Sequence, residues 1–272
     1  MATKKILITV KTYPSISTDH YEELVCTAGF DEEGNWIRIY PIPYRKLDYE
    51  LQYQKYQWIE LDLVKNTTDF RPETFKPRNV DDVKSITLLE KIDTKSNWAR
   101  RKEIVLKNVY TDMNRLISDA KTQGKWTSLA VFKPAAIKNF KYVNAPREWN
   151  TKQKGVLAQY HLFEDKGTKE VVRKLPFTFS YVFEDENGYE SQMMNEDWEL
   201  GALFWKCLKR HNGDEVRACE DVKRKYLDEF VMTKDLYFFL GTTRRHHLKA
   251  RNPFIIIGTF YPQKENQLKL DL

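Results

Sequence analysis

The chain has 272 residues, with 45 Lys and Arg against 39 Asp and Glu, a net charge of +6 and 14% aromatic residues. Ten glycines and ten prolines exclude a collagen-like or linker protein, and the aromatic content excludes a wholly disordered one. The length predicts one large domain or two small ones, and either can bury a sizeable core.

Cysteine usage and hydropathy indicate where the protein resides. Cys26, Cys207 and Cys219 form no closely spaced pair, so neither a disulfide framework nor a cysteine-based zinc site is supported. The apolar run near the N-terminus is too short for a signal peptide, and no window approaches the roughly 18 apolar residues of a membrane span. We therefore expect a cytoplasmic protein without a membrane partner.

The first part of the chain predicts antiparallel β-sheet. Strand-like patterns of apolar residues occur at 5–11, 24–30, 35–42, 58–64 and 86–92. Within the third of these runs, Ile37 and Ile39 share one face while Trp36, Arg38 and Tyr40 share the other, because side chains alternate along a strand. The polar, proline-containing stretch 66–83 predicts a surface loop.

A long helix and a second group of strands follow. Apolar residues spaced three and four apart predict a helix over 97–121, with Ser96 or Asn97 as its cap. Strands are expected at 129–132, 137–143, 155–163 and 177–183. The last of these places four aromatic rings on one face, which predicts a core wall or, if that face is open, a stacking platform for nucleic-acid bases. The core wall is the commoner arrangement.

The final third predicts two helices and two strands. Asn195 and Asp214 are expected to cap helices over 196–211 and 215–231, and strands are expected at 236–240 and 254–260. The whole pattern predicts an α+β fold in which antiparallel or mixed sheets, which could close into a barrel, carry about three long helices. A β-rich part, 1–93, and an α/β part, 94–272, are expected, although the two could equally form one domain.

Several sequence blocks resemble those of an uncharacterised family of bacterial proteins. They are KTYP at 11–14, VCTAGFDEEGNWIRIYPIPYR at 25–45, FTFSYVF at 177–183, EDWELG at 196–201, DLYFFLGTT at 235–243 and NPFIIIGTFYP at 252–262. The resemblance implies no settled activity, and it implies a place among the cargo of antiviral-defence or mobile-element gene clusters. Some relatives carry Cys and His after the FTFSYVF-like strand, but the segment 184–194 here has neither, so no metal is implied.

The densest cationic segment is TTRRHHLKAR at 242–251, between two predicted strands. Arginine and lysine on a loop held by rigid sheet can contact phosphates. The candidate nucleic-acid contacts in this segment are Arg244, Arg245, His247, Lys249 and Arg251. The alternative interpretation is a solvated hairpin tip.

Two further groups of cations are secondary candidates. Arg100, Arg101 and Lys102 lie at the start of the first predicted helix, where a bound anion would offset their conflict with the helix dipole. Arg38 and Arg45 lie among aromatic residues, which suits base stacking combined with phosphate contact. Solvation of the helix surface, and packing of arginine stems on rings, are the respective alternatives.

Carboxylates suggest a different function. Glu60 and Asp62 share one face of a predicted strand, and two acidic oxygens can hold Mg²⁺ beside a phosphate. Glu164, in the sequence Glu-Asp-Lys, is a weaker candidate of the same kind. Alternating acids are also common on exposed strands. The adjacent His246 and His247 are poor joint metal ligands.

The sequence therefore predicts a nucleic-acid-binding accessory protein that contacts DNA or RNA phosphates and needs no cofactor. The resemblance implies that it works in an antiviral-defence or mobile-element system. One alternative is a Mg²⁺-dependent nuclease that uses Glu60 and Asp62. The other is an interaction subunit that docks a partner ATPase or nuclease. The main prediction requires that the arginine-bearing segments converge on one electropositive surface.

Overall fold

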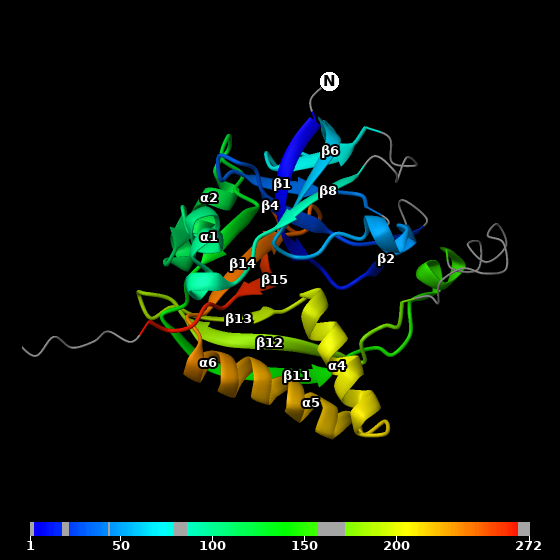
Figure 1. Cartoon of the computed structure of the whole chain (residues 1–272). Helices are drawn as coiled ribbons and strands as arrows, with labels where there is room; N and C mark the ends of the chain where they lie inside the picture. The colour runs from blue at the N-terminus through cyan, green and yellow to red at the C-terminus, as the bar shows by residue number, and fades with distance from the viewer. Residues whose placement is uncertain (1–2, 18–21, 43, 79–85, 157–171, 266–272) are drawn as a thin grey trace, which may run out of the picture.

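The computed structural model describes residues 3–17, 22–42, 44–78, 86–156 and 172–265 (Figure 1). Its helices and strands confirm the predicted α+β fold, and part of the sheet closes into a barrel. None of the helices in these ranges has the length and apolar character needed to cross a membrane.

Five N-terminal strands form a closed barrel. They are β1 (Thr3–Lys11), β4 (Thr27–Phe30), β5 (Trp36–Ile39), β6 (Gln57–Lys65) and β7 (Thr74–Pro77). Strand β1 pairs antiparallel with β4 and with β6, β4 pairs antiparallel with β5, β5 pairs parallel with β7, and β7 pairs antiparallel with β6. This order, β1-β4-β5-β7-β6, is that of the five-stranded Greek-key barrel known as the OB-fold.

Shorter elements complete the N-terminal half. Strand β8 (Thr87–Lys91) pairs with β6, and β2 (Ser15–Ser17) pairs with β3 (Glu22–Leu24) in the connection between β1 and β4. Two short 3-10 helices, η1 (Tyr44–Lys46) and η2 (Tyr49–Leu51), connect β5 to β6. Strand β7 lies within the predicted loop 66–83, so that prediction missed a strand of the barrel.

The C-terminal strands repeat the same order of connections. They are β9 (Val109–Tyr110), β10 (Leu129–Phe132), β11 (Ala136–Asn144), β12 (Phe177–Glu184), β13 (Glu190–Met194), β14 (Tyr237–Thr242) and β15 (Phe254–Phe260). The consecutive strands β10 and β11 act as one bent first strand, since β10 pairs antiparallel with β14 and β11 pairs antiparallel with β12. Strand β12 pairs with β13 and β14 pairs with β15, so these strands form two sheets, β15-β14-β10-β9 and β11-β12-β13. A parallel bridge between Asn195 and Ile256 joins the end of β13 to β15, and we call the two sheets together the C-terminal barrel.

The helices differ from the sequence prediction in their bounds. They are α1 (Lys95–Val105), α2 (Met113–Lys121), α4 (Trp198–Arg210), α5 (Glu215–Lys223) and α6 (Phe230–Thr233), with a π-helical segment (Arg224–Glu229) between the last two. Helices α4 to α6 connect β13 to β14 and lie along the sheet β11-β12-β13 (Figure 1). An OB-fold carries its helix at this same connection, between its third and fourth strands.

Besides the missed strand β7, four local predictions were wrong. Neither Ser96 nor Asn97 caps the first helix, because α1 already begins at Lys95, after Thr94. The single helix over 97–121 is two helices, because β9 between them pairs with β10 and Asp112 caps α2 by accepting the Arg115 N–H. Residues 151–156 are helical where a strand over 155–163 was expected, and the rest of that range lies outside the described residues. Asp197, rather than Asn195, caps α4 by accepting the Glu199 N–H.

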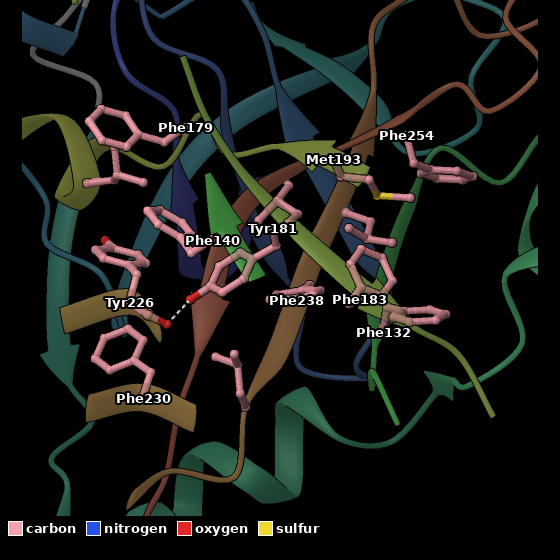
Figure 2. Close-up of a cluster of buried hydrophobic side chains, with 14 of the residues drawn as sticks. Phe132, Phe140, Phe179, Tyr181, Phe183, Met193, Tyr226, Phe230, Phe238 and Phe254 are labelled. Atoms are coloured by element: carbon pink, nitrogen blue, oxygen red, sulfur yellow. Dashed lines mark hydrogen bonds between the residues drawn. The ribbon is translucent and has the colours of Figure 1, made fainter. Parts of the chain in front are cut away.

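The aromatic face of β12 is part of the core of the C-terminal barrel. Phe179, Tyr181 and Phe183 are almost fully buried, and they pack with aromatic residues of neighbouring strands and of the helices (Figure 2). The buried Tyr181 hydroxyl donates a hydrogen bond of 2.6 Å to the Tyr226 carbonyl. The core-wall interpretation is therefore confirmed, and these three rings are not available for base stacking.

Besides the apolar core of each barrel, a third apolar cluster contains residues from both barrels. Strand β1 alternates, so that Ile6 and Ile8 point into the N-terminal barrel while Leu7 packs against the other half of the chain. The buried members of this shared cluster are Leu7, Val10, Ala28, Phe30, Tyr56, Ile92, Val105, Leu129, Val131, Phe239, Ile257 and Phe260. Because residues from both barrels are removed from water together, this cluster fixes the position of one barrel against the other.

Polar contacts also join the barrels. The backbone continues from β1 into a bridge between Thr12 and Asp197, and the Tyr13 N–H donates to the Glu196 carbonyl at 2.7 Å. The Lys55 ammonium, between β5 and β6, donates to both carboxylate oxygens of Asp197 at 2.7 and 2.9 Å. The side chains of this ion pair are 6% and 0% exposed, so it is a buried link between the halves.

Candidate nucleic-acid interface

A cavity of about 820 Å³ lies between the two barrels. On the N-terminal side it is lined by the connection β1–β4, the end of β5, the connection β6–β7 and one residue of β7. The lining residues on this side are Thr12, Tyr13, Pro14, Ser15, Leu24, Cys26, Arg38, Tyr40, Pro41, Asn66, Thr68, Asp69, Arg71 and Lys76.

Topologically equivalent elements of the C-terminal barrel line the other side. These are the connection β11–β12, the start of β12, the end of β13 and the connection β14–β15 with the strand ends beside it. The lining residues on this side are Ala145, Trp149, Lys174, Leu175, Phe177, Thr178, Phe179, Met194, Asn195, Glu196, Gly241, Thr242, Thr243, Arg244, Ile255 and Ile257.

These elements are the ones through which an OB-fold binds its ligands. OB-folds bind oligonucleotides and oligosaccharides on the face of strands 2 and 3 and with the loops between strands 1 and 2 and between strands 4 and 5. The corresponding connections are 12–26 and 66–73 in the N-terminal barrel and 145–176 and 243–253 in the C-terminal barrel. The cavity therefore lies where the two barrels face each other with the sides on which OB-folds bind their ligands.

Positive charge predominates among the residues that line the cavity. Of the described residues that line it, five are cationic, namely Arg38, Arg71, Lys76, Lys174 and Arg244, and two, Asp69 and Glu196, are acidic. Asp69 is already paired, because its carboxylate accepts hydrogen bonds from the Arg71 guanidinium at 2.6 to 3.1 Å. A concave site with this balance of charge favours an anionic ligand.

Arg38 holds the wall of the cavity together. Its side chain is 2% exposed and donates to the Ser128 hydroxyl at 2.7 Å, to the Ser128 carbonyl at 3.0 Å and to the Thr74 hydroxyl at 3.2 Å. Burial and then repulsion from Arg71 lower the pKa of Arg38. Arg38, which was predicted as a phosphate contact, therefore uses its donors inside the protein, and its two hydrogen bonds to Ser128 join the two barrels.

His247 anchors the cationic loop from inside. Its ring is fully buried, Nε2 lies 2.7 Å from the Ala120 carbonyl oxygen, and Nδ1 lies 2.7 Å from the Thr242 hydroxyl. A carbonyl can only accept, so Nε2 carries the proton in the neutral ring and Nδ1 accepts from Thr242. Burial lowers the pKa of His247 and keeps this neutral form.

The same loop is held at its base by Arg71, whose guanidinium donates to the Thr242 carbonyl at 2.5 Å. Arg244 then enters the lining of the cavity. Arg245, Lys249 and Arg251 are exposed on the same loop, and no side-chain hydrogen bond or ion pair joins any of these four cations to another described residue. The predicted loop thus presents cations to solvent on a fixed base.

The cations at the start of α1 are engaged elsewhere. Arg100 forms an ion pair with Glu90, and Lys102 forms one with Glu265. Arg101 is 5% exposed, donates to the Ile92 carbonyl at 2.6 and 3.1 Å, and lies over the rings of Tyr56 and Trp98.

None of these three cations lines the cavity, and neither does Arg45, which lies in η1. The structure therefore brings only part of the predicted set together, on the loop that contains Arg244.

The carboxylates of the nuclease interpretation lie on β6. Glu60 is opposite Lys5 of β1, and Asp62 forms an ion pair with Arg78 at 2.7 Å. Within the described ranges no three His, Cys, Asp or Glu residues are grouped as metal ligands. Glu164 lies outside the described residues.

Several lining residues were not predicted from the sequence. Lys76 and Lys174 each have one arginine within two residues, Arg78 and Arg173 respectively, which is too little to mark a cationic segment, and Asn195 was assigned to a helix cap. One signal was available, because all of them lie in loops or at strand ends, where binding residues concentrate. Which of the many loops meet in space depends on barrel closure, and no local pattern encodes that.

Two family models match the chain, one for each barrel. Residues 109–272 match a domain of unknown function (DUF8757), and residues 2–107 match a second domain of unknown function (DUF8758). The chain belongs to the DUF8757 family. The two matches meet between α1 and β9, at the junction of the two barrels. No curated protein and no solved structure matches the chain.

Proposed function

We propose that this protein binds single-stranded nucleic acid in the cavity between its two barrels. The observation that carries the proposal is that the ligand-binding elements of both OB-type barrels line one cavity with an excess of cationic side chains. Lys76, Lys174 and Arg244 are the cations we assign to phosphate contact. The side chains of Lys76 and Arg244 form no hydrogen bond or ion pair with another described residue, and the Lys174 ammonium, which donates to the Glu148 carbonyl at 2.9 Å, has two further donors.

The surroundings of these cations support a single strand over other ligands. Tyr13, Tyr40, Trp149 and Phe177 line the cavity and are only partly buried, so unstacked bases can pack on their exposed edges and faces. An oligosaccharide would gain little from three cations. A double helix presents its bases inside, where these rings cannot reach them.

Other parts of the sequence prediction enter this proposal unchanged. Arg245, Lys249 and Arg251 extend the cationic loop beyond the cavity and would contact the strand where it leaves. A cytoplasmic location agrees with Cys26, Cys207 and Cys219, which are free thiols. The association with antiviral-defence or mobile-element genes rests on sequence resemblance.

Fluorescence anisotropy with labelled 12-nucleotide DNA and RNA strands, and with a 12-base-pair duplex, tests the proposal. We expect binding to single strands that weakens as salt rises from 50 to 200 mM, because bound phosphates release counterions. Arg244→Ala and Lys76→Ala should each weaken binding and reduce the slope of log K against log salt by about 0.7 for each lost phosphate contact.

Arg100→Ala is the matched control. Arg100 is also an exposed arginine, but it pairs with Glu90 and does not line the cavity, so its loss should leave both affinity and salt slope unchanged. Absence of salt-sensitive binding to any of the probes would refute the proposal. A loss of affinity in Arg100→Ala as large as that in Arg244→Ala would place binding elsewhere and also refute it.

A further inference from the structure

A second pocket, of about 590 Å³, adjoins the cavity between the barrels. Trp149 and Lys174 line both spaces, so the pocket continues the cavity. Its other described walls are the connection β11–β12, Trp205 of α4 and Glu215 at the start of α5. These helices are not among the elements through which an OB-fold binds its ligands, so the pocket, which we call the outer groove, reaches beyond the site described above.

The acidic residues that line the outer groove are already paired. Glu215 accepts hydrogen bonds from the Arg147 guanidinium at 2.5 and 2.7 Å, and Glu148 forms an ion pair with Lys154. Among the described residues the groove is lined by four cations and two acids, so a net charge of +2 remains after this pairing. Such an excess next to a cationic cavity favours an anionic ligand that extends from one space into the other.

Arg173 presents one of the two remaining positive charges from a fixed base. The Tyr13 hydroxyl donates to the Arg173 carbonyl at 2.7 Å and accepts the Trp205 indole N–H at 2.7 Å. The Arg173 guanidinium lies 5.4 Å from the centre of the Trp205 ring, is exposed, and forms no hydrogen bond or ion pair with another described residue. Its planar set of donors is therefore open to a phosphate.

Trp149 and Lys174 lie where the cavity and the outer groove meet. Trp149 is partly buried, and the Lys174 ammonium lies 5.7 Å from the centre of its ring. A base of any identity can stack on a partly exposed tryptophan. Because a single strand carries a phosphate at every nucleotide, a strand that leaves the cavity past these two residues brings further phosphates to Arg173.

We infer that the outer groove binds the continuation of a nucleic-acid strand that leaves the cavity. The inference rests on the proposed function. A base stacks on Trp149 at the junction. Arg173, held in place by Trp205 and Tyr13, contacts a phosphate beyond it. An acidic peptide would also meet these cations, but the two residues shared with the cavity favour the ligand that the cavity itself binds.

The test measures how affinity depends on strand length. Fluorescence anisotropy is recorded with labelled strands of thymidines or uridines, whichever bind more tightly, over the roughly 4–16 nucleotides that OB-folds cover. We expect Arg173→Ala to leave the affinity for the shortest strands unchanged. For the longest strands it should weaken binding about fivefold at 100 mM salt and reduce the slope of log K against log salt by about 0.7, because one phosphate contact is lost.

Two other arginines provide the controls. Arg244 lines the cavity but not the outer groove, so Arg244→Ala should weaken binding at every length. Arg217 is an exposed arginine of α5 that lines neither space, so Arg217→Ala should leave the affinity unchanged at every length.

Photo-crosslinking of wild-type protein gives a second readout that depends on no variant. Strands built of 5-bromouridine are bound and irradiated, and the crosslinked peptides are identified by mass spectrometry. The longest strand should crosslink to the peptide that contains Trp205, whereas the shortest should crosslink only to peptides that line the cavity.

Equal effects of Arg173→Ala on short and long strands, or no effect at any length, would overturn the inference and leave the proposed function standing. Absence of a crosslink to the Trp205 peptide with the longest strand would overturn it as well. Failure of wild-type protein to bind any strand would refute the proposed function and the inference with it.

Discussion

The ion pair between Lys55 and Asp197 provides the sharpest test of how the two barrels are held together. Lys55→Met keeps most of the side-chain volume and removes the ammonium. Asp197, which is fully buried, then loses the ammonium that lies 2.7 and 2.9 Å from its two carboxylate oxygens. Among the described residues, the backbone N–H of Glu199 is then the donor that its carboxylate keeps. Breaking a buried pair in this way costs about 3–5 kcal/mol, because an uncompensated charge is left in the interior.

The electrostatics of Lys55 support that magnitude. Burial alone would lower the pKa of its ammonium, but attraction to the carboxylates of Asp197 and Glu199 outweighs burial and raises the pKa. Burial also raises the pKa of Asp197, and attraction to Lys55 opposes that rise, so each charge depends on the other. Loss of the pair should therefore remove a large part of the roughly 5–15 kcal/mol free energy of unfolding of a typical domain.

Urea denaturation followed by tryptophan fluorescence and circular dichroism measures this loss. Lys55→Met combined with Asp197→Asn should recover at least about 2 kcal/mol relative to Lys55→Met, because the asparagine still caps α4 without a buried charge. Arg100→Met, which breaks an exposed pair with Glu90, should leave the free energy of unfolding nearly unchanged, because solvent screens that pair. A loss below about 1 kcal/mol for Lys55→Met would refute the reasoning.

Two further predictions concern residues around the cavity. The pKa of His247 is lowered in the folded protein, so below about pH 6.5 the unfolded chain takes up a proton there more readily than the folded chain. The free energies of unfolding of wild type and His247→Gln, measured from pH 7.5 to 5, should therefore converge, by at most about 1.4 kcal/mol per pH unit. A difference that stays constant with pH would contradict this. Gly201→Ala places a Cβ 2.2 Å from the Tyr13 ring and should lower the free energy of unfolding by about 1–3 kcal/mol in the same denaturation assay. The control is Gly155→Ala, whose Cβ meets nothing within 4 Å, and it should leave this free energy unchanged. Equal effects of the two substitutions would show that the contact with Tyr13 is not tight.

Local periodicity predicted most strands because each strand has two different faces. Along β5, Ile37 and Ile39 were correctly placed on one face and Arg38 on the other. The outer face was expected to carry exposed cations, but it packs against the second barrel, and Arg38 is buried there. Alternation therefore identifies two faces, while what covers the outer one depends on contacts with Ser128, 90 residues further along the chain.

Loop chemistry was predictable only in part for the same reason. The cationic character of the segment containing Arg244 and Arg245 is visible in the sequence, as is its place between two strands. The burial of His247 is not, because it depends on the distant carbonyl of Ala120. The sequence places Glu196 at the start of the predicted helix 196–211, and only the structure shows that it lines a cavity and that its carboxylate has no partner among the described residues.

The arrangement of the barrels explains why each of the two family models covers only one wall of the cavity. Leu7 and Phe30 from one barrel pack with Val131 and Phe239 from the other, so each half in isolation would expose an apolar surface that the whole chain buries. The cavity is divided in the same way, with Lys76 on one side and Arg244 on the other. Because one apolar cluster fixes both walls, the nucleic acid that we propose as ligand would meet cations that are already in place, and its binding would not have to bring the barrels together.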